Sequence, residues 1–81
     1  MTRKQIMEEI TKIFRNVFDD DEIKLEDKTA AEDIEDWDSL MHITLITAIE
    51  DHFNVKFKLK EVTGLQDVGA TVDLVEAKLN E

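Results

Sequence analysis

The sequence has 81 residues with no Cys, no Pro and two Gly, and its 20 Asp and Glu against 10 Lys and Arg give a net charge of −10. One domain over residues 1–81 fits this length, and the lack of Cys excludes disulfides and thiolate metal sites. The acidic balance opposes binding to nucleic acid or to anionic membranes and favours basic protein surfaces as partners.

The first predicted element is a helix over residues 3–18. Its apolar residues recur at spacings of three and four and form one stripe: Ile6, Ile10, Ile13, Phe14, Val17 and Phe18. Thr2 is a residue type that caps helix N-termini, so we expect the helix to begin after it.

A long connection follows over residues 19–37, without a sustained apolar period. Its apolar residues are expected to pin it onto the core: Ile23, Leu25, Ile34 and Trp37. The acidic start of the connection does not fit an EF-hand. Counted from Asp19, the sixth position is Lys24 instead of Gly and the twelfth is Ala30 instead of Glu.

A second helix is predicted from residue 39 or 40 to about residue 53, with Asp38 as its N-cap. Its apolar residues cover a broad face, which predicts the central helix of the fold. On this helix we expect Leu40 and Ile43 to face the core. The outward-facing residues are expected to be Met41, Thr44 and Thr47.

The remaining chain predicts an extended connector over residues 55–60, a short helical turn over 59–63 and a last helix. Gly64 could end the turn, and Asp67 is the expected N-cap of the last helix, which runs to about residue 79. Gly69 is a poor helix former near its start. The fold class is therefore all-α, a small bundle of three main helices plus one short helix, with a long loop between the first two.

Ser39, His42 and the adjacent Asp38 match a hydrolase triad in composition only. No Gly-rich elbow or oxyanion donor pair accompanies them, and near neighbours on one helix rarely orient the base correctly. His42 and His52 lie ten residues apart, too far round a helix for a shared metal. We therefore predict neither a catalytic residue nor a metal site.

The tripeptide Asp38-Ser39-Leu40 opens the second predicted helix after a long acidic loop. It resembles the phosphopantetheine attachment motif of acyl carrier proteins. Further segments resemble that family in order and spacing: IKLEDKT in the first loop, WDSLMHITLITAIEDHFNVKF in the second helix and LQDVGATVDLVEAKL in the last. The resemblance implies that Ser39 carries the phosphopantetheine arm, with Asp38 as its motif neighbour. A phosphodiester at a helix N-terminus would meet free amide donors and the positive end of the helix dipole.

The resemblance implies a carrier and not an enzyme. A phosphopantetheinyl transferase would move the arm from coenzyme A to Ser39, and the arm's thiol would hold an acyl group as a thioester. The other implied partners are an acyl-loading ligase or acyltransferase and downstream enzymes of lipid or polyketide biosynthesis. We expect a cytoplasmic protein, because no segment has the apolar run of a membrane span or of a secretion signal. We also expect the carrier to be a monomer.

Partner enzymes are expected to dock on the second helix and the acidic loop before it. The expected docking residues are Glu35, Asp36, Trp37, Leu40, Met41, Thr44, Glu50 and Asp51. Many fatty-acid carriers have acidic residues where Met41 and Thr44 stand, and a small residue where Trp37 stands. These departures favour a specialised stand-alone carrier. For Trp37, anchoring the loop on the core is the favoured role over a partner contact.

Two alternatives to an acyl carrier stay open. One is an aminoacyl or peptidyl carrier protein, which would use the same arm on Ser39. The other is an acidic helical adaptor that binds a basic partner and is never modified. Exposure to a broad-specificity transferase with coenzyme A separates the adaptor from the carriers.

Overall fold

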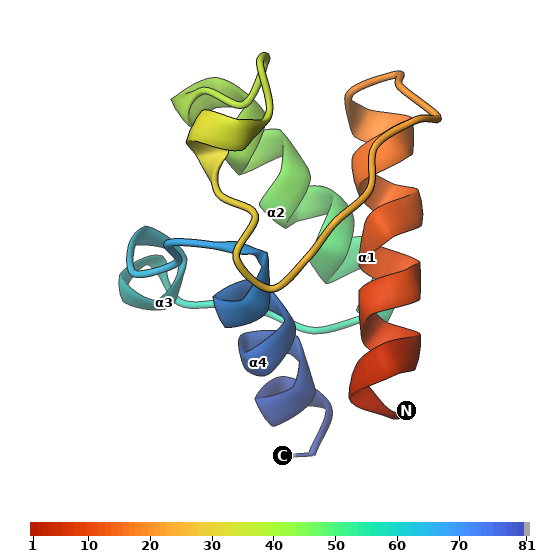
Figure 1. Cartoon of the computed structure of the whole chain (residues 1–81). Helices are drawn as coiled ribbons and strands as arrows, with labels where there is room; N and C mark the ends of the chain where they lie inside the picture. The colour runs from red at the N-terminus through yellow and green to blue at the C-terminus, as the bar shows by residue number, and fades with distance from the viewer. Residues whose placement is uncertain (81) are drawn as a thin grey trace.

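The structure is a computed structural model that describes residues 1–80. In it these residues form four α helices and one short 3₁₀ helix (Figure 1). The elements in chain order are α1 (Arg3–Val17), η1 (Ala31–Asp33), α2 (Ser39–Phe53), α3 (Leu59–Thr63) and α4 (Val68–Leu79). The described residues contain no strand, which confirms the predicted all-α bundle of three main helices and one short helix. Glu81, the last residue of the domain predicted over 1–81, lies outside the described residues.

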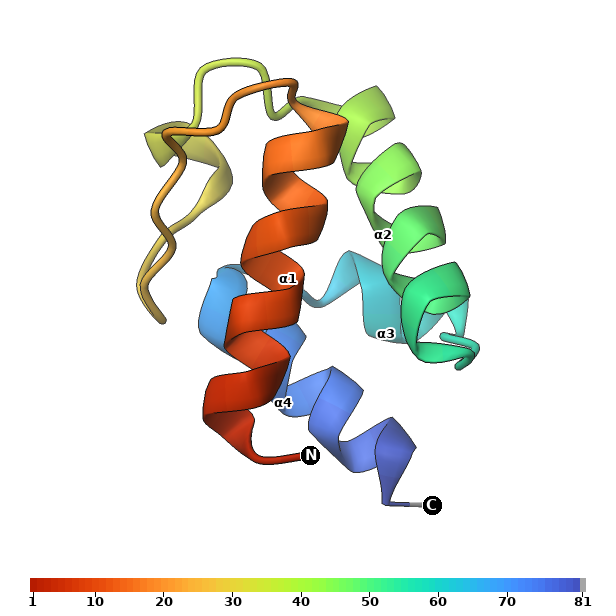
Figure 2. The same cartoon turned by 90° about the vertical axis from the view of Figure 1, so that its right-hand side faces the viewer.

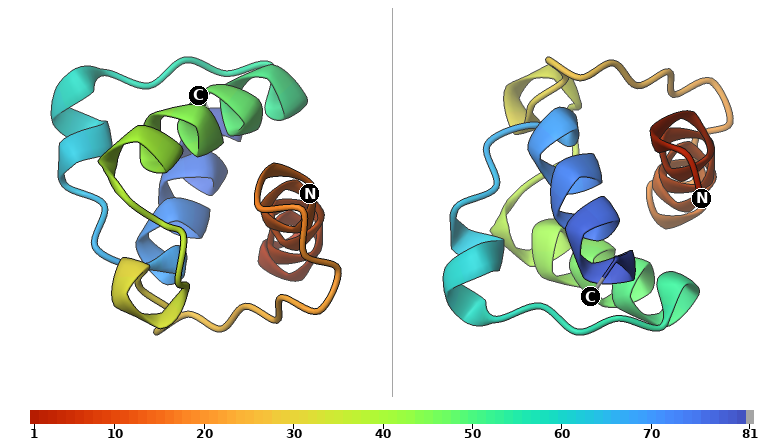
Figure 3. Two further views of the ribbon diagram at one scale, coloured as in Figure 1. Left: turned by 90° about the horizontal axis from the view of Figure 1, so that it is seen from above. Right: turned by 90° about the horizontal axis from the view of Figure 1, so that it is seen from below.

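Helix α1 packs against both α2 and α4, so these three helices enclose the core. The views from above and below place α3 on the side of the bundle away from α1 (Figure 3). Figure 2 shows the long loop leaving the end of α1, running beside the bundle and returning to the start of α2. None of the helices in residues 1–80 is long and apolar enough to cross a membrane.

The core draws on one face of each long helix. Its buried apolar residues are Ile6, Ile10, Ile13, Phe14, Leu45, Ile46, Ile49, Phe53, Val68, Val72 and Val75. All four loop residues predicted to pin the connection are partly buried and pack against this core: Ile23, Leu25, Ile34 and Trp37. The loop therefore has a defined course over the bundle, as its apolar residues indicated.

Each long helix begins with the side-chain cap that its sequence predicted. Thr2, Asp38 and Asp67 each accept a hydrogen bond from the backbone amide three residues later, at 3.2, 2.8 and 2.8 Å. The first turn of a helix has amides without a partner inside the helix, and a cap satisfies one of them. The three caps therefore fix where the helices start, including the start of α2 at Ser39.

The rotation of α2 differs from the sequence prediction. Leu40 and Ile43, which were expected to face the core, are 71% and 62% exposed. Of the other apolar residues on α2, Leu45, Ile46 and Ile49 are buried, and Leu45 and Ile49 pack in the core with residues of α1 and α4. A helix with apolar residues on several sides has no single stripe, so spacing alone does not determine which side is buried.

The outward side of α2 follows the prediction only in part. Thr44 and Thr47 are exposed as expected, but Met41 is half-buried. Met41 shares a hollow with Val17 and Phe18 at the end of α1. The prediction that Met41 lies free on the outer side was therefore wrong, because the same rotation that exposes Ile43 turns Met41 toward α1.

The loop is tied to the start of α4 by two backbone hydrogen bonds. The Val68 amide donates to the Thr29 carbonyl at 2.8 Å, and the Gly69 amide donates to the Asp27 carbonyl at 2.9 Å. A Cβ at position 69 would lie 2.9 Å from that Asp27 oxygen, which is closer than real Cβ contacts come. Gly69, a poor helix former, is therefore required here by the close approach of the loop backbone.

We expect Gly69→Ala to lower the free energy of unfolding by about 1–3 kcal/mol, because the added methyl group must displace the loop backbone. Urea unfolding at 25 °C measures this change. The matched control is Gly64→Ala, whose Cβ would meet its nearest neighbour at 3.5 Å, an ordinary contact. If Gly69→Ala proves as stable as Gly64→Ala, the loop does not depend on this approach.

Candidate functional site

Ser39 is the first residue of α2, and its side chain is exposed where the long loop meets the helix. The neighbouring Asp38 carboxylate caps the helix by accepting from the Met41 amide. Among residues 1–80, no partner hydrogen-bonds the Ser39 hydroxyl. Capping is thus performed by Asp38, and the Ser39 hydroxyl remains accessible to another molecule.

Trp37 anchors the end of the loop on the core. Its ring packs edge-on against Phe14, with ring centroids 5.2 Å apart, and lies 6.5 Å from the Phe18 ring. Its indole Nε1–H donates to Nδ1 of His42 at 3.2 Å. These contacts confirm the predicted role of Trp37 as a loop anchor and hold the residues just before Ser39 in place.

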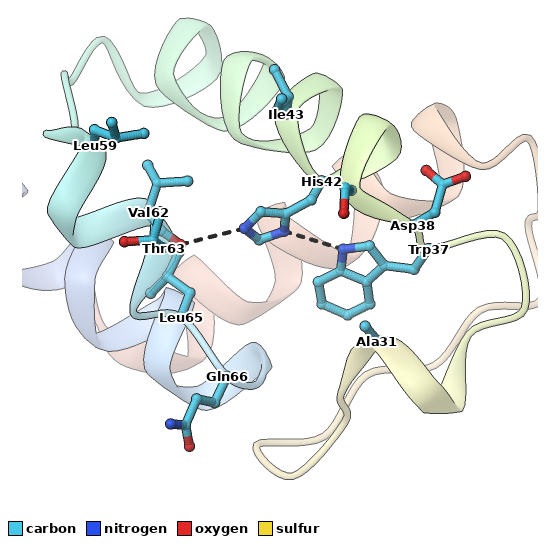
Figure 4. Close-up of a pocket in the computed structure, with 11 residues that line it drawn as sticks. Ala31, Trp37, Asp38, His42, Ile43, Leu59, Val62, Thr63, Leu65 and Gln66 are labelled. Carbon is cyan, nitrogen blue, oxygen red and sulfur yellow. Dashed lines mark hydrogen bonds between the residues drawn. The ribbon is translucent and has the colours of Figure 1, made fainter.

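The two ring nitrogens of His42 both point to partners other than Ser39. Nδ1 accepts from Trp37, and Nε2 lies 3.5 Å from the carbonyl oxygen of Val62 (Figure 4). A general base must bond the hydroxyl that it deprotonates. The arrangement therefore agrees with the rejection of a hydrolase triad from the sequence.

A groove of about 510 Å³ opens beside Ser39, between the start of α2 and α3. Its walls are mainly apolar and come from η1, the loop before α2, α2, α3 and the segment after α3: Ala31, Trp37, Ile43, Leu59, Val62 and Leu65. Its polar lining residues are Asp38, Ser39, His42, Thr63 and Gln66. Figure 4 shows the His42 ring between the indole of Trp37 and the carbonyl of Val62. The groove could accommodate a flexible apolar chain attached at Ser39.

Sequence reasoning missed this groove. One wall of the groove includes Ile43, which the sequence prediction assigned to the core. Another wall is α3, which spans only five residues. Leu59, at 80%, is an exposed apolar side chain of the groove wall, and Leu40 and Ile43 near Ser39 on α2 are exposed as well. Exposed apolar side chains that gather in one place mark a binding surface.

Helix α3, one wall of the groove, is held to α4 through Glu61. The Glu61 carboxylate accepts from the Lys58 amide at 2.8 Å and pairs with Lys78 at 3.1 Å. These contacts, led by the hydrogen bond from the Lys58 backbone, lower the pKa of Glu61. A lowered pKa favours the folded state at neutral pH, and this contribution disappears as the pH falls through the folded-state pKa.

The structure brings most, but not all, of the predicted docking residues together. Six of them lie at or just before the start of α2, with Trp37 and Met41 half-buried and the others exposed: Glu35, Asp36, Trp37, Leu40, Met41 and Thr44. Glu50 and Asp51 lie three turns further along the helix. Glu50 also accepts the Phe57 amide at 2.8 Å, so it holds the connector after α2.

The acidic groups of residues 19–38 are poorly compensated. Among the described residues, only Asp27 of this stretch forms an ion pair, with Arg3 at 3.2 Å, and Arg3 also pairs with Asp73 on α4. No group of three or more His, Asp or Glu side chains in residues 1–80 is placed to hold a metal ion. Unpaired like charges on a compact chain repel one another.

We expect salt to stabilise the fold by screening this repulsion. Raising NaCl from about 20 to about 300 mM should raise the thermal midpoint by about 2–8 °C, the shift that roughly 0.5–1 kcal/mol gives in a domain of this size. Melting followed by circular dichroism measures the midpoint. A midpoint that stays constant or falls would show that the carboxylates are better compensated than the ion pairs indicate.

Comparisons with known proteins agree with this geometry. The model of the family described as "phosphopantetheine attachment site" matches residues 4–75. A similar solved structure is the solution NMR structure of holo acyl carrier protein from Geobacter metallireducens, with 48% identity and a TM-score of 0.88. That match covers 93% of this chain and 86% of the other. No curated protein sequence gives a significant match.

Proposed function

The chain belongs to the acyl carrier protein family, whose members are carriers and not enzymes and hold a covalent phosphopantetheine group, and we propose that Ser39 is the residue that carries it. The observation that supports this most directly is the exposed Ser39 hydroxyl, which no described residue binds, at the start of α2 beside the groove. Ser39 is also the only Ser in the sequence.

The residues around Ser39 fit a phosphodiester. Asp38 satisfies the Met41 amide, whereas the first amides of α2, at Ser39 and Leu40, precede the hydrogen-bonded part of the helix. These amides and the positive end of the helix dipole favour a negative group on Ser39. When bound, the arm supplies a terminal thiol that carries an acyl group as a thioester, chemistry that a chain without Cys lacks.

The chain's own residues present and shelter this group. Trp37 fixes the loop before Ser39, so the hydroxyl is held outward for a phosphopantetheinyl transferase. The groove walls from α2 and α3 can cover apolar parts of the arm and its cargo, which lowers their contact with water. The exposed side chains of Leu40, Ile43 and Leu59 offer an apolar contact to acyl-loading and downstream enzymes.

The test is transfer of the arm from coenzyme A to the unmodified protein by a broad-specificity phosphopantetheinyl transferase with Mg²⁺. We expect the intact mass to show one arm per chain, and fragmentation of the tryptic peptide 29–56 to place it on Ser39. Absence of any added mass would overturn the carrier function and favour the unmodified adaptor. An arm on a Thr of the same peptide would overturn the assignment to Ser39.

We propose further that the carrier serves a dedicated ligase or acyltransferase in a specialised pathway. The first turns of α2 after Ser39 carry no acidic residue and contain Leu40, Met41, Ile43 and Thr44. Such a surface selects partners by shape and apolar contact more than by charge. A bacterial strain depleted of its fatty-acid carrier tests this, since a specialised carrier should not restore growth. The intact mass of protein purified from its source separates an acyl cargo from an aminoacyl or peptidyl cargo.

A further inference from the structure

The proton of the neutral His42 ring is assigned by its neighbour Trp37. Because the indole Nε1–H donates to Nδ1 at 3.2 Å, Nδ1 must present a lone pair, and the ring proton resides on Nε2. The two rings also stack, with centroids 6.0 Å apart and planes inclined by 25°. Trp37 therefore fixes both the tautomer and the orientation of the imidazole.

Among residues 1–80, the Nε2–H group of His42 lacks a good acceptor. Its nearest acceptor, the Val62 carbonyl oxygen, is 3.5 Å away, at the upper limit for a hydrogen bond. That oxygen already accepts from the Gly64 amide and, at 3.3 Å, from the Leu65 amide. A carbonyl oxygen has two lone pairs, so His42 is a third donor to an acceptor that is already satisfied.

This donor lies where the attached arm would pass. His42 and Ser39 both line the groove and lie three residues apart on α2, so they are neighbours on one helix face. The walls next to the imidazole are apolar, at Ile43, Val62 and Leu65. A hydrogen bond made among such groups is stronger than one made in water.

We propose that His42 is a positioning residue, whose Nε2–H donates to a carbonyl oxygen of the attached arm or of its acyl cargo and so holds the chain in the groove. The donor exchanges its long contact with Val62 for this oxygen, and Val62 keeps its two backbone donors. Amide carbonyls of the arm and the carbonyls of the cargo share this chemistry. The proposal rests on attachment at Ser39, and its test starts from samples whose arm is verified by intact mass.

The first measurement is the Nε2 resonance of His42 in histidine-labelled protein, in the apo form, the holo form and the holo form loaded with an octanoyl group. A changed Nε2–H signal in the holo form identifies an arm carbonyl as the acceptor, and a change that requires loading identifies the cargo. His52 is the internal control, since it lies at the far end of α2 and pairs with Glu9 at 3.3 Å. A verified arm with no change at His42 in either form overturns the proposal and leaves the attachment at Ser39 standing.

The second measurement separates positioning from a structural role. Attachment and loading should shift the backbone amide signals of Val62 and Leu65 in the wild type. In His42→Phe, which keeps a ring beside Trp37 but has no donor, these shifts should fall at least twofold. His42→Gln, which retains a side-chain donor, should recover them in part, and the exposed Thr47→Val should match the wild type. Equal shifts in the wild type and His42→Phe would overturn the proposal.

Discussion

Ser39→Ala should gain no phosphopantetheine arm under conditions in which every wild-type chain gains one. The Ser39 hydroxyl oxygen is the atom that would form the phosphodiester, and no other Ser exists in the sequence. The fold should be retained, because Asp38 still caps α2 and Ala is tolerated at an exposed first-turn position. Intact mass measures the arm, and urea unfolding should differ from the wild type by less than about 0.5 kcal/mol.

The matched control for this loss is Thr47→Ala. Thr47 presents an exposed hydroxyl on the same helix, two turns beyond Ser39, and this O–H group donates to the Ile43 carbonyl oxygen at 3.0 Å. Its removal should leave attachment complete. If Ser39→Ala still gains one arm, a Thr hydroxyl is the acceptor and the assignment of Ser39 is wrong.

The second large effect is expected in the core. Ile49→Ala should lower the free energy of unfolding by about 2–5 kcal/mol, because Ile49 is 0% exposed and its truncation leaves a cavity between α1, α2 and α4. Urea unfolding at 25 °C, monitored by Trp37 fluorescence and circular dichroism, measures the loss. If the variant is too unstable to study, Ile49→Val should cost about 0.5–1.5 kcal/mol.

Ile43→Ala is the control, because it removes the same atoms from the same helix. Ile43 is 62% exposed, so its truncation should change stability by less than about 0.5 kcal/mol. The sequence prediction placed Ile43 in the core and so predicted a large loss of stability for Ile43→Ala. An equal or larger loss in Ile43→Ala would mean that α2 is rotated as the sequence first indicated and that the groove beside Ser39 has another shape.

The helices and their caps could be predicted because their signals are local. Helix α1 has one apolar stripe, and the caps Thr2, Asp38 and Asp67 each satisfy an amide three residues away. The resemblance around Ser39 was equally visible, since it lies in contiguous segments. Each of these features depends on residues within one or two helical turns.

The rotation of α2 and the groove could not be predicted, because both depend on contacts between distant segments. Ile43 and Ile49 have the same residue type and similar neighbours, and only the positions of α1 and α4 determine which one is buried. The need for Gly at position 69 likewise depends on the close approach of the Asp27 backbone, 42 residues earlier in the chain. His42 could be recognised as more than a half-buried helix residue only once Trp37 and Val62 were seen on either side of it.

The two bonds between the loop and α4 have a consequence for local unfolding. The amide protons of Val68 and Gly69 belong to the first turn of α4, yet their acceptors lie on the loop, at Thr29 and Asp27. Hydrogen exchange at these two amides therefore requires the loop to separate from the helix, whereas amides later in α4 exchange when the helix itself opens. The logarithm of the protection factor at Val68 and Gly69 therefore measures the free energy that holds the loop against α4. The far end of this loop leads through Trp37 to the proposed attachment site.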